Sequence, residues 1–259
     1  MTEFSHIVAE LGLTLAITDE SFFGAATVTP EMCVPGTNAL RTSIIAVWAD
    51  VVTGAVAGRF ISPQIPLTLD LEVQVHRPTF TGTRLVCEGL LVKAGRSIVV
   101  THGRFRDEAT GELHAETVAS FMTAPGSHQI GREGSPMIAV DAVPLAVPFA
   151  QRCGSRTIEP GVVEVPRRPD GLNPGGAIQG GIVAFAAEQA AASLHHEPVL
   201  LVSLNVRYLR PFMVGPARCV ATGTGEVSVV HLTDAGTGKI GAIATTRART
   251  DWPTLMAKS

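Results

Sequence analysis

The chain has 259 residues, enough for one large domain or for two domains of roughly 100 to 130 residues that each bury a core. Apolar residues make up 46% and charged residues 17% of the sequence, a globular composition that excludes extensive disorder. The net charge of −3 argues against a nucleic-acid partner, because such proteins usually present a basic surface.

The amino terminus and the cysteines bear on where the protein works. The segment MTEFSHIVAE carries acidic and no basic residues, so it does not resemble a secretion signal. No segment shows the run of about 18 apolar residues that predicts a membrane span. The four cysteines form no CxxC pair and are expected to be reduced core thiols: Cys33, Cys87, Cys153 and Cys219. We therefore expect a cytoplasmic protein without a membrane partner or a metal site.

The first predicted helix is apolar on all sides. Between Ile44 and Ala57 its only charged residue is Asp50. A helix without a polar face is a buried helix, and a carboxylate inside it must be solvated, hydrogen-bonded or used in chemistry. A strand is predicted at 69–75, where apolar and polar side chains alternate and one face is therefore buried.

The second half of the chain repeats this order of elements. Residues 202–215 (VSLNVRYLRPFMVG) match 69–82 (LDLEVQVHRPTFTG) in the same alternating phase, at an offset of 133. Residues 176–197 match 37–58, and within them Gln179 corresponds to Arg41 and Glu188 to Asp50 at an offset of 138. Glu188 is the single charged residue of the second apolar helix. An internal repeat of this kind predicts two copies of one structural unit.

The repeat also predicts the domain organisation. A third pair of segments, 106–116 and 233–243, places an aspartate and a glycine at a hairpin turn between strands. Residues 126–144 are rich in Gly, Pro and Ser and predict a linker, which leaves 1–125 and 145–259 as the two repeats. Each repeat is interpreted as a strand, a long buried helix and several antiparallel strands, which is an α+β fold.

The residues that open the second helix follow the pattern of a known enzyme family. The segment 173–188, NPGGAIQGGIVAFAAE, resembles the active-site helix of hotdog-fold acyl-CoA thioesterases of the phenylacetate-pathway and 4-hydroxybenzoyl-CoA types. Their pattern is an Asn or Gln, then His-Gly-Gly six residues later, then an acidic residue nine after the His. In this sequence the positions are filled by Asn173, Gln179, Gly180, Gly181 and Glu188. Gln179 therefore replaces the His, whose part is expected to be orienting the loop.

The first repeat keeps less of the family pattern. Asp50 occupies the acidic position, but Arg-Thr-Ser at 41–43 replaces His-Gly-Gly, and Pro35 stands where the Asn is expected. The strand motif R-P-x-x-x-G and a Gly-Arg turn also resemble the family. The resemblance implies a tandem double hotdog, in which one continuous curved sheet wraps two antiparallel helices. The residues expected to bind substrate are Arg41, Thr42, Arg77, Arg96, Gln179, Gly181 and Arg210.

Thioester hydrolysis explains why these residue types occur together. The reaction needs a polarised carbonyl and an activated water or a carboxylate nucleophile. A helix amino terminus supplies unpaired N–H groups, and a glycine admits a substrate oxygen, so Gly180 is a candidate oxyanion-hole donor. Asn173 is a candidate ligand of the thioester carbonyl or of a water. A carboxylate in an apolar site is suited to act as a general base or nucleophile.

Helix geometry decides which acid can serve which glycine. Gly180 and Glu188 are eight residues apart, about 12 Å along one helix, so they cannot act on the same thioester. If the two repeats pack with antiparallel helices, Asp50 faces Gly180 and Asn173. Glu188 then faces the residues at 41–43. We therefore expect composite sites between the repeats, of which the Asp50 site has the complete set of groups.

The sequence thus predicts hydrolysis of an acyl-CoA or a related acyl thioester, with coenzyme A as part of the substrate and no cofactor. Hotdog sheets that join edge to edge also favour a homodimer or a higher homo-oligomer. Two other functions remain open, a hydratase or dehydratase of enoyl or hydroxyacyl thioesters and a non-catalytic acyl-CoA binding protein. Structural roles also remain open: satisfied core carboxylates, glycines that permit close packing, and Asn173 as a turn former.

Overall fold

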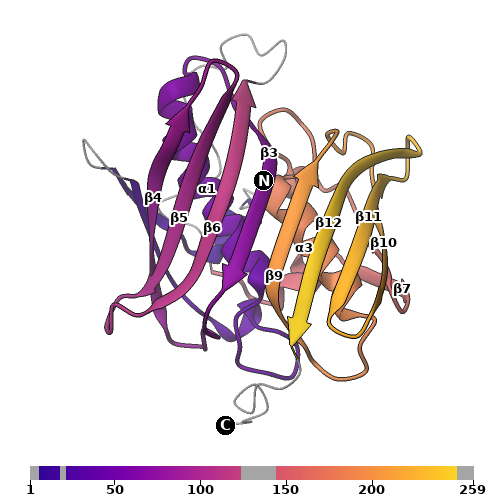
Figure 1. Cartoon of the computed structure of the whole chain (residues 1–259). Helices are drawn as coiled ribbons and strands as arrows, with labels where there is room; N and C mark the ends of the chain where they lie inside the picture. Colours follow the sequence, from indigo (N-terminus) through magenta and orange to yellow (C-terminus); the bar gives the residue numbers. More distant parts are fainter. Residues whose placement is uncertain (1–5, 18–21, 124–143, 250–259) are drawn as a thin grey trace, which may run out of the picture.

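The computed structural model describes residues 6–17, 22–123 and 144–249. Two long helices, α1 (Thr42–Ile61) and α3 (Gly180–Ala192), lie within a curved antiparallel sheet of twelve strands (Figure 1). Short helical turns are η1 (Ala9–Leu11), η2 (Pro30–Met32), α2 (Phe149–Arg152) and η3 (Pro169–Gly171). The strands are β1 (Thr14–Ile17), β2 (Phe22–Thr27), β3 (Pro66–Val75), β4 (Arg84–Ala94), β5 (Ile98–Asp107), β6 (Leu113–Thr123), β7 (Arg156–Glu159), β8 (Val162–Val165), β9 (Leu200–Tyr208), β10 (Ala217–Thr224), β11 (Val227–Asp234) and β12 (Lys239–Arg249).

The strand order shows the internal duplication directly. The first repeat runs β1-β2-β4-β5-β6-β3 across the sheet. The second repeat runs β9-β12-β11-β10-β8-β7, which is the same order of equivalent strands reversed. The two repeats join where β3 pairs with β9, with Glu72 opposite Asn205. These two residues are 133 apart, and the Asn205 side chain donates to the Glu72 carboxylate at 3.3 Å. The predicted tandem double hotdog with a continuous sheet is confirmed; the predicted linker, 126–144, lies outside the described residues except for its last position.

Alternation along the strands explains which face of the sheet holds the helices. In β3, Leu71 and Val73 are buried, and in β9 their neighbours Leu204 and Val206 are buried as well. These side chains pack beneath α1 and α3, which also contact each other. A β-carbon on Gly181 would lie 2.5 Å from Cγ2 of Val47, so only a glycine permits this close approach of the two helices. The four cysteines are free and buried.

The hydropathy of α1 corrects one expectation from the sequence. This helix has twenty residues and contains an 18-residue window with a mean hydropathy of 1.7, so by length and composition it could cross a membrane. In the described fold, however, 67% of that window is buried inside the protein. Its apolar character is therefore explained by contact with the sheet and with α3, as in other buried helices.

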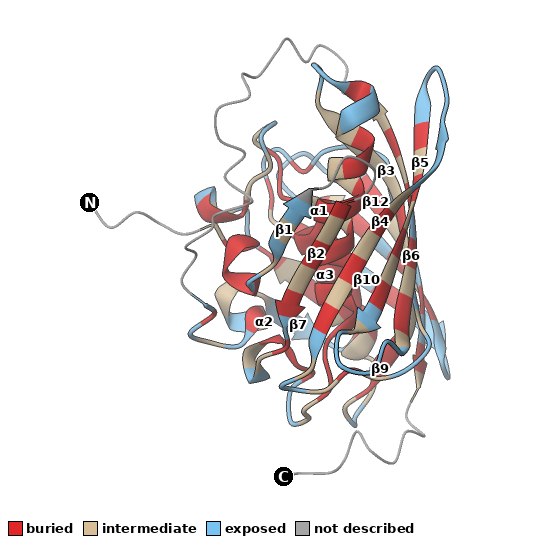
Figure 2. Cartoon of the chain, turned by 90° about the vertical axis from the view of Figure 1, so that its left-hand side faces the viewer, coloured by how far each residue is buried: buried red, intermediate tan, exposed pale blue. Residues whose placement is uncertain are grey.

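The first repeat is longer than the second at one end. Helix α1 has 20 residues against 13 in α3, and β4 and β5 have 11 and 10 residues against 8 in both β10 and β11. The end of α1 and the tip of β5 therefore project beyond the rest of the molecule, and Figure 2 shows exposed residues on both. This extension lies at the end of the sheet where β3 begins.

Candidate active site

The Asp50 carboxylate lies at the interface between the two repeats. It projects from the middle of α1 and accepts two hydrogen bonds, from Oγ1 of Thr68 at 2.8 Å and from Nε2 of Gln179 at 2.9 Å. Thr68 belongs to β3, whereas Gln179 precedes α3 in the other repeat. Burial raises the pKa of Asp50 to about 6, and the Thr68 hydrogen bond opposes this rise because it stabilises the charged form. At neutral pH the group is therefore a carboxylate of unusually high basicity.

Gln179 orients Asp50 relative to the amino terminus of α3. It is the N-cap of that helix, and its Oε1 accepts from the N–H of Ile182 at 3.1 Å. A backbone N–H can only donate, so the amide oxygen must face Ile182 and the amide nitrogen must face Asp50. The Gln179 side chain is buried, which leaves it in this one arrangement. The glutamine thus links the helix cap and the carboxylate.

The start of α3 presents the groups that an oxyanion needs. Among the described residues, no acceptor is bound to the backbone N–H groups of Gly180 and Gly181. A β-carbon on Gly180 would lie 3.4 Å from Oδ2 of Asp50 and 3.6 Å from both Cζ and the hydroxyl of Tyr208. The bare glycine therefore leaves a small space between the carboxylate and the phenol. The positive end of the helix dipole faces outward at this point.

Sequence reasoning missed Tyr208 and Thr68, which both border this space. The Tyr208 hydroxyl donates to the carbonyl oxygen of Gly180 at 2.9 Å. Burial, followed by the nearby Asp50 charge, raises its pKa well above the usual value, so the phenol stays neutral and can donate. Tyr208 is the chain's one tyrosine, and it stands on the repeated strand where the first repeat has Val75. That difference between the repeats was the available signal.

Asn173 has a structural role in the turn before α3. Its Oδ1 accepts from the N–H groups of Gly175 and Ala177, both at 3.0 Å. Within the described residues, no hydrogen bond joins Asn173 to Asp50 or to Gln179. The side chain shapes the loop that leads into the helix, as Asx turns do. Its direct contact with a substrate remains a prediction.

The second half-site is built differently around Glu188. This carboxylate is 2% exposed and lies 3.3 Å from Nη1 of Arg41. It also accepts from the backbone N–H of Ser43 at 3.2 Å and from the Ser43 hydroxyl. The neighbouring Thr42 hydroxyl donates instead to the carbonyl of Leu201. The glutamate therefore occupies the amino terminus of α1, where the equivalent positions of α3 are open.

Comparison with protein-family models finds a match within the first repeat. Residues 42–114 match the thioesterase superfamily. The match spans α1, β3, β4 and β5 and therefore includes Asp50 and Thr68. A search of the curated proteins found no match.

Solved structures share the fold over nearly the whole chain. A 12:0-ACP thioesterase from Umbellularia californica is 12% identical with a TM-score of 0.65, covering 90% of this chain and 99% of its own. A putative thioesterase II from Thermobifida fusca is 17% identical with a TM-score of 0.63, covering 95% and 100%. An acyl-ACP thioesterase from Bacteroides thetaiotaomicron is 8% identical with a TM-score of 0.63, covering 88% and 97%. At these identities the likeness establishes the double-hotdog fold.

The arginines predicted to bind substrate are distributed over both ends of this double-hotdog fold. Arg96, in the β4–β5 turn, and Arg210, after β9, lie at the end of the sheet where Asp50 is found. Arg77 follows β3 at the opposite end and forms an exposed ion pair with Glu112 at 3.3 Å. Arg41 is buried in the second half-site. The structure therefore brings only Arg96 and Arg210 to the Asp50 end.

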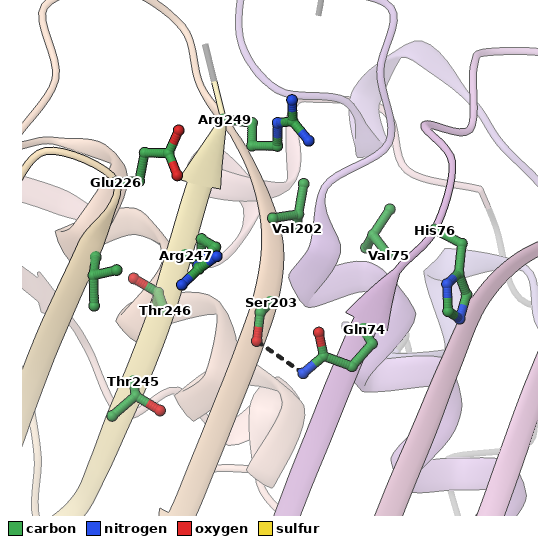
Figure 3. A pocket seen from close by; sticks show the side chains of 11 residues that line it. Gln74, Val75, His76, Val202, Ser203, Glu226, Thr245, Thr246, Arg247 and Arg249 are labelled. Carbon is green, nitrogen blue, oxygen red and sulfur yellow. Dashed lines mark hydrogen bonds between the residues drawn. The ribbon is translucent and has the colours of Figure 1, made fainter. Parts of the chain in front are cut away.

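A hollow of about 800 Å³ lies at the opposite end of the seam between the repeats (Figure 3). It is lined by the end of β3 and the start of β9, including Gln74 and Ser203, and by Arg247 on β12. Gln74 Nε2 donates to the Ser203 hydroxyl at 3.0 Å across this seam. None of the groups that surround Asp50 lines it. The hollow is therefore separate from the candidate active site.

Proposed function

We propose that this protein hydrolyses an acyl thioester, carried by coenzyme A or by an acyl carrier protein, at the Asp50 site. The observation that carries the proposal is the position of Asp50, a basic carboxylate held beside the open amino terminus of α3. The superfamily match over residues 42–114 and the shared fold of the solved thioesterases support the same reaction class.

The groups at the site suggest how the reaction would proceed. The thioester carbonyl oxygen accepts from the free N–H groups of Gly180 and Gly181, which polarises the carbon and stabilises the oxyanion. Asp50 takes a proton from a water molecule, whose oxygen attacks that carbon. When the tetrahedral intermediate collapses, the carbon–sulfur bond breaks and the proton on Asp50 passes to the leaving sulfur. The products are a carboxylic acid and a free thiol.

Gln179 and Tyr208 hold this arrangement without exchanging protons. The Gln179 amide donates to Asp50 and caps α3, so it fixes the carboxylate relative to the oxyanion donors. The neutral Tyr208 phenol holds the first carbonyl of the helix. Positioning of this kind contributes to the rate because the reacting groups are already aligned when the substrate binds.

Release of free thiol from a panel of thioesters tests the proposal. The panel pairs each acyl group with coenzyme A and with pantetheine, and a thiol reagent follows the product. We expect hydrolysis of at least one acyl group by the wild-type protein and its loss in Asp50→Asn. Hydration of crotonyl-CoA without thiol release would contradict the proposal, and so would binding of acyl-CoA without turnover of any panel member.

A further inference from the structure

The end of the sheet that contains the Asp50 site also exposes apolar and basic side chains. At this end β4, β6 and β9 finish and β3, β5 and β12 begin, as the arrowheads in Figure 1 show. The register confirms it, since Asp70 near the start of β3 lies opposite Arg207 near the end of β9. Thr68 and Tyr208, which border the site, belong to these same strand ends. The Asp50 site and this surface are therefore at the same end of the sheet.

Large apolar side chains are exposed around this end. They come from the end of α1, the β4–β5 hairpin and the loop after β9: Phe60, Leu91, Val92, Leu209, Met213 and Val214. Val92 is 61% exposed and Val214 is 57% exposed. Single exposed apolar residues are common, but a group gathered on one end of a fold marks an interaction surface.

Cations are interspersed with these apolar residues. They are Lys93, Arg96, Arg207, Arg210 and Lys239, and among the described residues none of the five forms an ion pair. Acidic side chains lie here as well: Asp70 is half-buried on β3, Glu164 at the end of β8 is ion-paired with Arg156 and Arg218, and Asp234 is buried and accepts from the N–H groups of Val214 and Gly215. At the opposite end, Arg84 forms an ion pair with Glu108 and Arg77 forms one with Glu112. The chain as a whole is acidic, so the positive charge at this end is local.

We propose that this surface docks a small acidic carrier protein that delivers the acyl thioester to Asp50 on a flexible arm. The inference rests on the proposed function and specifies its substrate class. The cations extend from β4 to β12, five strand spacings or about 24 Å across the sheet. The phosphates of coenzyme A form a compact group that would need convergent donors, and they would leave the apolar residues uncovered. An acidic protein surface matches both the breadth and the mixture of charge and apolar area.

Catalysis by three forms of one substrate tests the docking surface. The same acyl group is offered on acyl carrier protein, on coenzyme A and on pantetheine, which has no carrier. We expect wild-type kcat/KM to be at least tenfold higher for the carrier-protein form than for the coenzyme A form. The double variant Lys93→Glu/Lys239→Glu should lose about tenfold in kcat/KM for the carrier-protein form, mainly through KM, and retain pantetheine hydrolysis within twofold. The matched control Arg247→Glu, at the opposite end of β12, should leave all three rates unchanged.

Binding measured without turnover separates this inference from the proposed function. Fluorescence anisotropy of labelled acyl carrier protein should report salt-sensitive binding that the double variant loses and Arg247→Glu keeps. Absence of pantetheine hydrolysis would count against the proposed function alone, because carrier binding is measured independently. Equal kcat/KM for the carrier-protein and coenzyme A forms, or unchanged carrier binding in the double variant, would overturn the docking surface. Binding to vesicles of phosphatidylcholine and phosphatidylglycerol that the double variant loses, without carrier binding, would show a lipid-facing surface instead.

Discussion

The two half-sites of this duplicated protein place an acid at the same position of each helix but use it in opposite ways. In the first, Asp50 binds the Gln179 and Thr68 side chains and leaves the amino terminus of α3 open. In the second, Glu188 reaches the amino terminus of α1 and accepts from the Ser43 backbone. An acid that fills the oxyanion position cannot also act on a carbonyl placed there.

The difference arises from small changes at equivalent positions. A glutamate is one methylene longer than an aspartate, and Arg41 stands where the second repeat has the neutral Gln179. The guanidinium neutralises Glu188, and both side chains are almost completely buried. A buried charge pair with additional hydrogen bonds is costly to break. In the second half-site the acid is therefore part of a structural contact between the repeats.

The largest effect is expected from Asp50→Asn. The change keeps the side-chain volume and removes the base, so kcat should fall by about 10³-fold, within the range of general-base catalysis. KM should change little, because Asp50 is not the group that binds the carrier. Steady-state thiol release gives both constants, and an unchanged thermal unfolding midpoint serves as the control. An Asn variant with wild-type kcat would remove Asp50 from the mechanism.

Gly180→Ala tests whether the space beside Asp50 holds the reacting carbonyl. The added methyl would meet its neighbours at 3.4 to 3.6 Å, which is ordinary contact, so stability should be unchanged. Because the methyl fills the space between Asp50 and Tyr208, kcat/KM should fall by about 10²-fold, comparable to loss of one oxyanion donor. The matched variant Gly58→Ala, on the exposed end of α1 with open space around it, should retain full activity. Full activity in the Gly180 variant would place the carbonyl elsewhere.

Thr68→Val shifts the pH dependence without removing the base. The wild-type kcat/KM should rise with pH through about 6, because Asp50 must be ionised to accept a proton and its pKa lies near that value. The Thr68 hydroxyl stabilises the ionised form, so its loss should raise the pKa and move the rising limb to higher pH. At pH 6 the rate should therefore drop several-fold, whereas at high pH it should recover. A rising limb that stays in place or moves to lower pH would contradict the assignment of Asp50 as the base that the Thr68 hydroxyl stabilises.

Tyr208→Phe should have a modest effect. The phenol supports the first carbonyl of α3 with one neutral hydrogen bond, which contributes about 1 kcal/mol, so kcat should fall about fivefold. The rising limb of the profile of kcat/KM against pH should not move to higher pH, since the neutral phenol transfers no proton. A loss as large as that of Asp50→Asn would make the phenol a direct participant. Tyr208→Val, which copies the residue of the first repeat, provides the comparison.

The features of the fold that repeat along the chain could be predicted from sequence, and those that differ between repeats could not. The alternating pattern of β3 and β9 at a fixed offset located the seam, and the lone acid in each apolar helix identified Asp50 and Glu188. The eight-residue separation of Gly180 and Glu188 also required a partner acid from the other helix. Thr68 and Tyr208 were missed because the equivalent position in the other repeat is in each case an apolar residue.

Local contacts set the remaining limits. Nothing in the sequence shows that Glu188 binds the Ser43 backbone, because that depends on how far its side chain reaches across the helix interface. Asn173 matched the family motif, yet its oxygen is engaged by the turn that it forms. The sequence did not predict that the end of α1 is exposed, although its last turn carries Phe60 into the proposed docking surface. Motif spacing therefore located the site, and side-chain geometry determined its details.

The ratio of kcat for Glu188→Gln to kcat for Asp50→Asn, measured on one acyl-pantetheine, tests the central claim of a single productive half-site most directly. Pantetheine removes any contribution from carrier docking. Because Glu188→Gln leaves Arg41 buried without its partner, folding is checked for both variants, and Arg41→Met/Glu188→Leu provides a version without the charges. The account predicts that the folded Glu188 variants keep at least half of wild-type kcat, so the ratio exceeds about 10². A ratio near one, or an inactive Glu188→Gln beside an active Asp50→Asn, would contradict it.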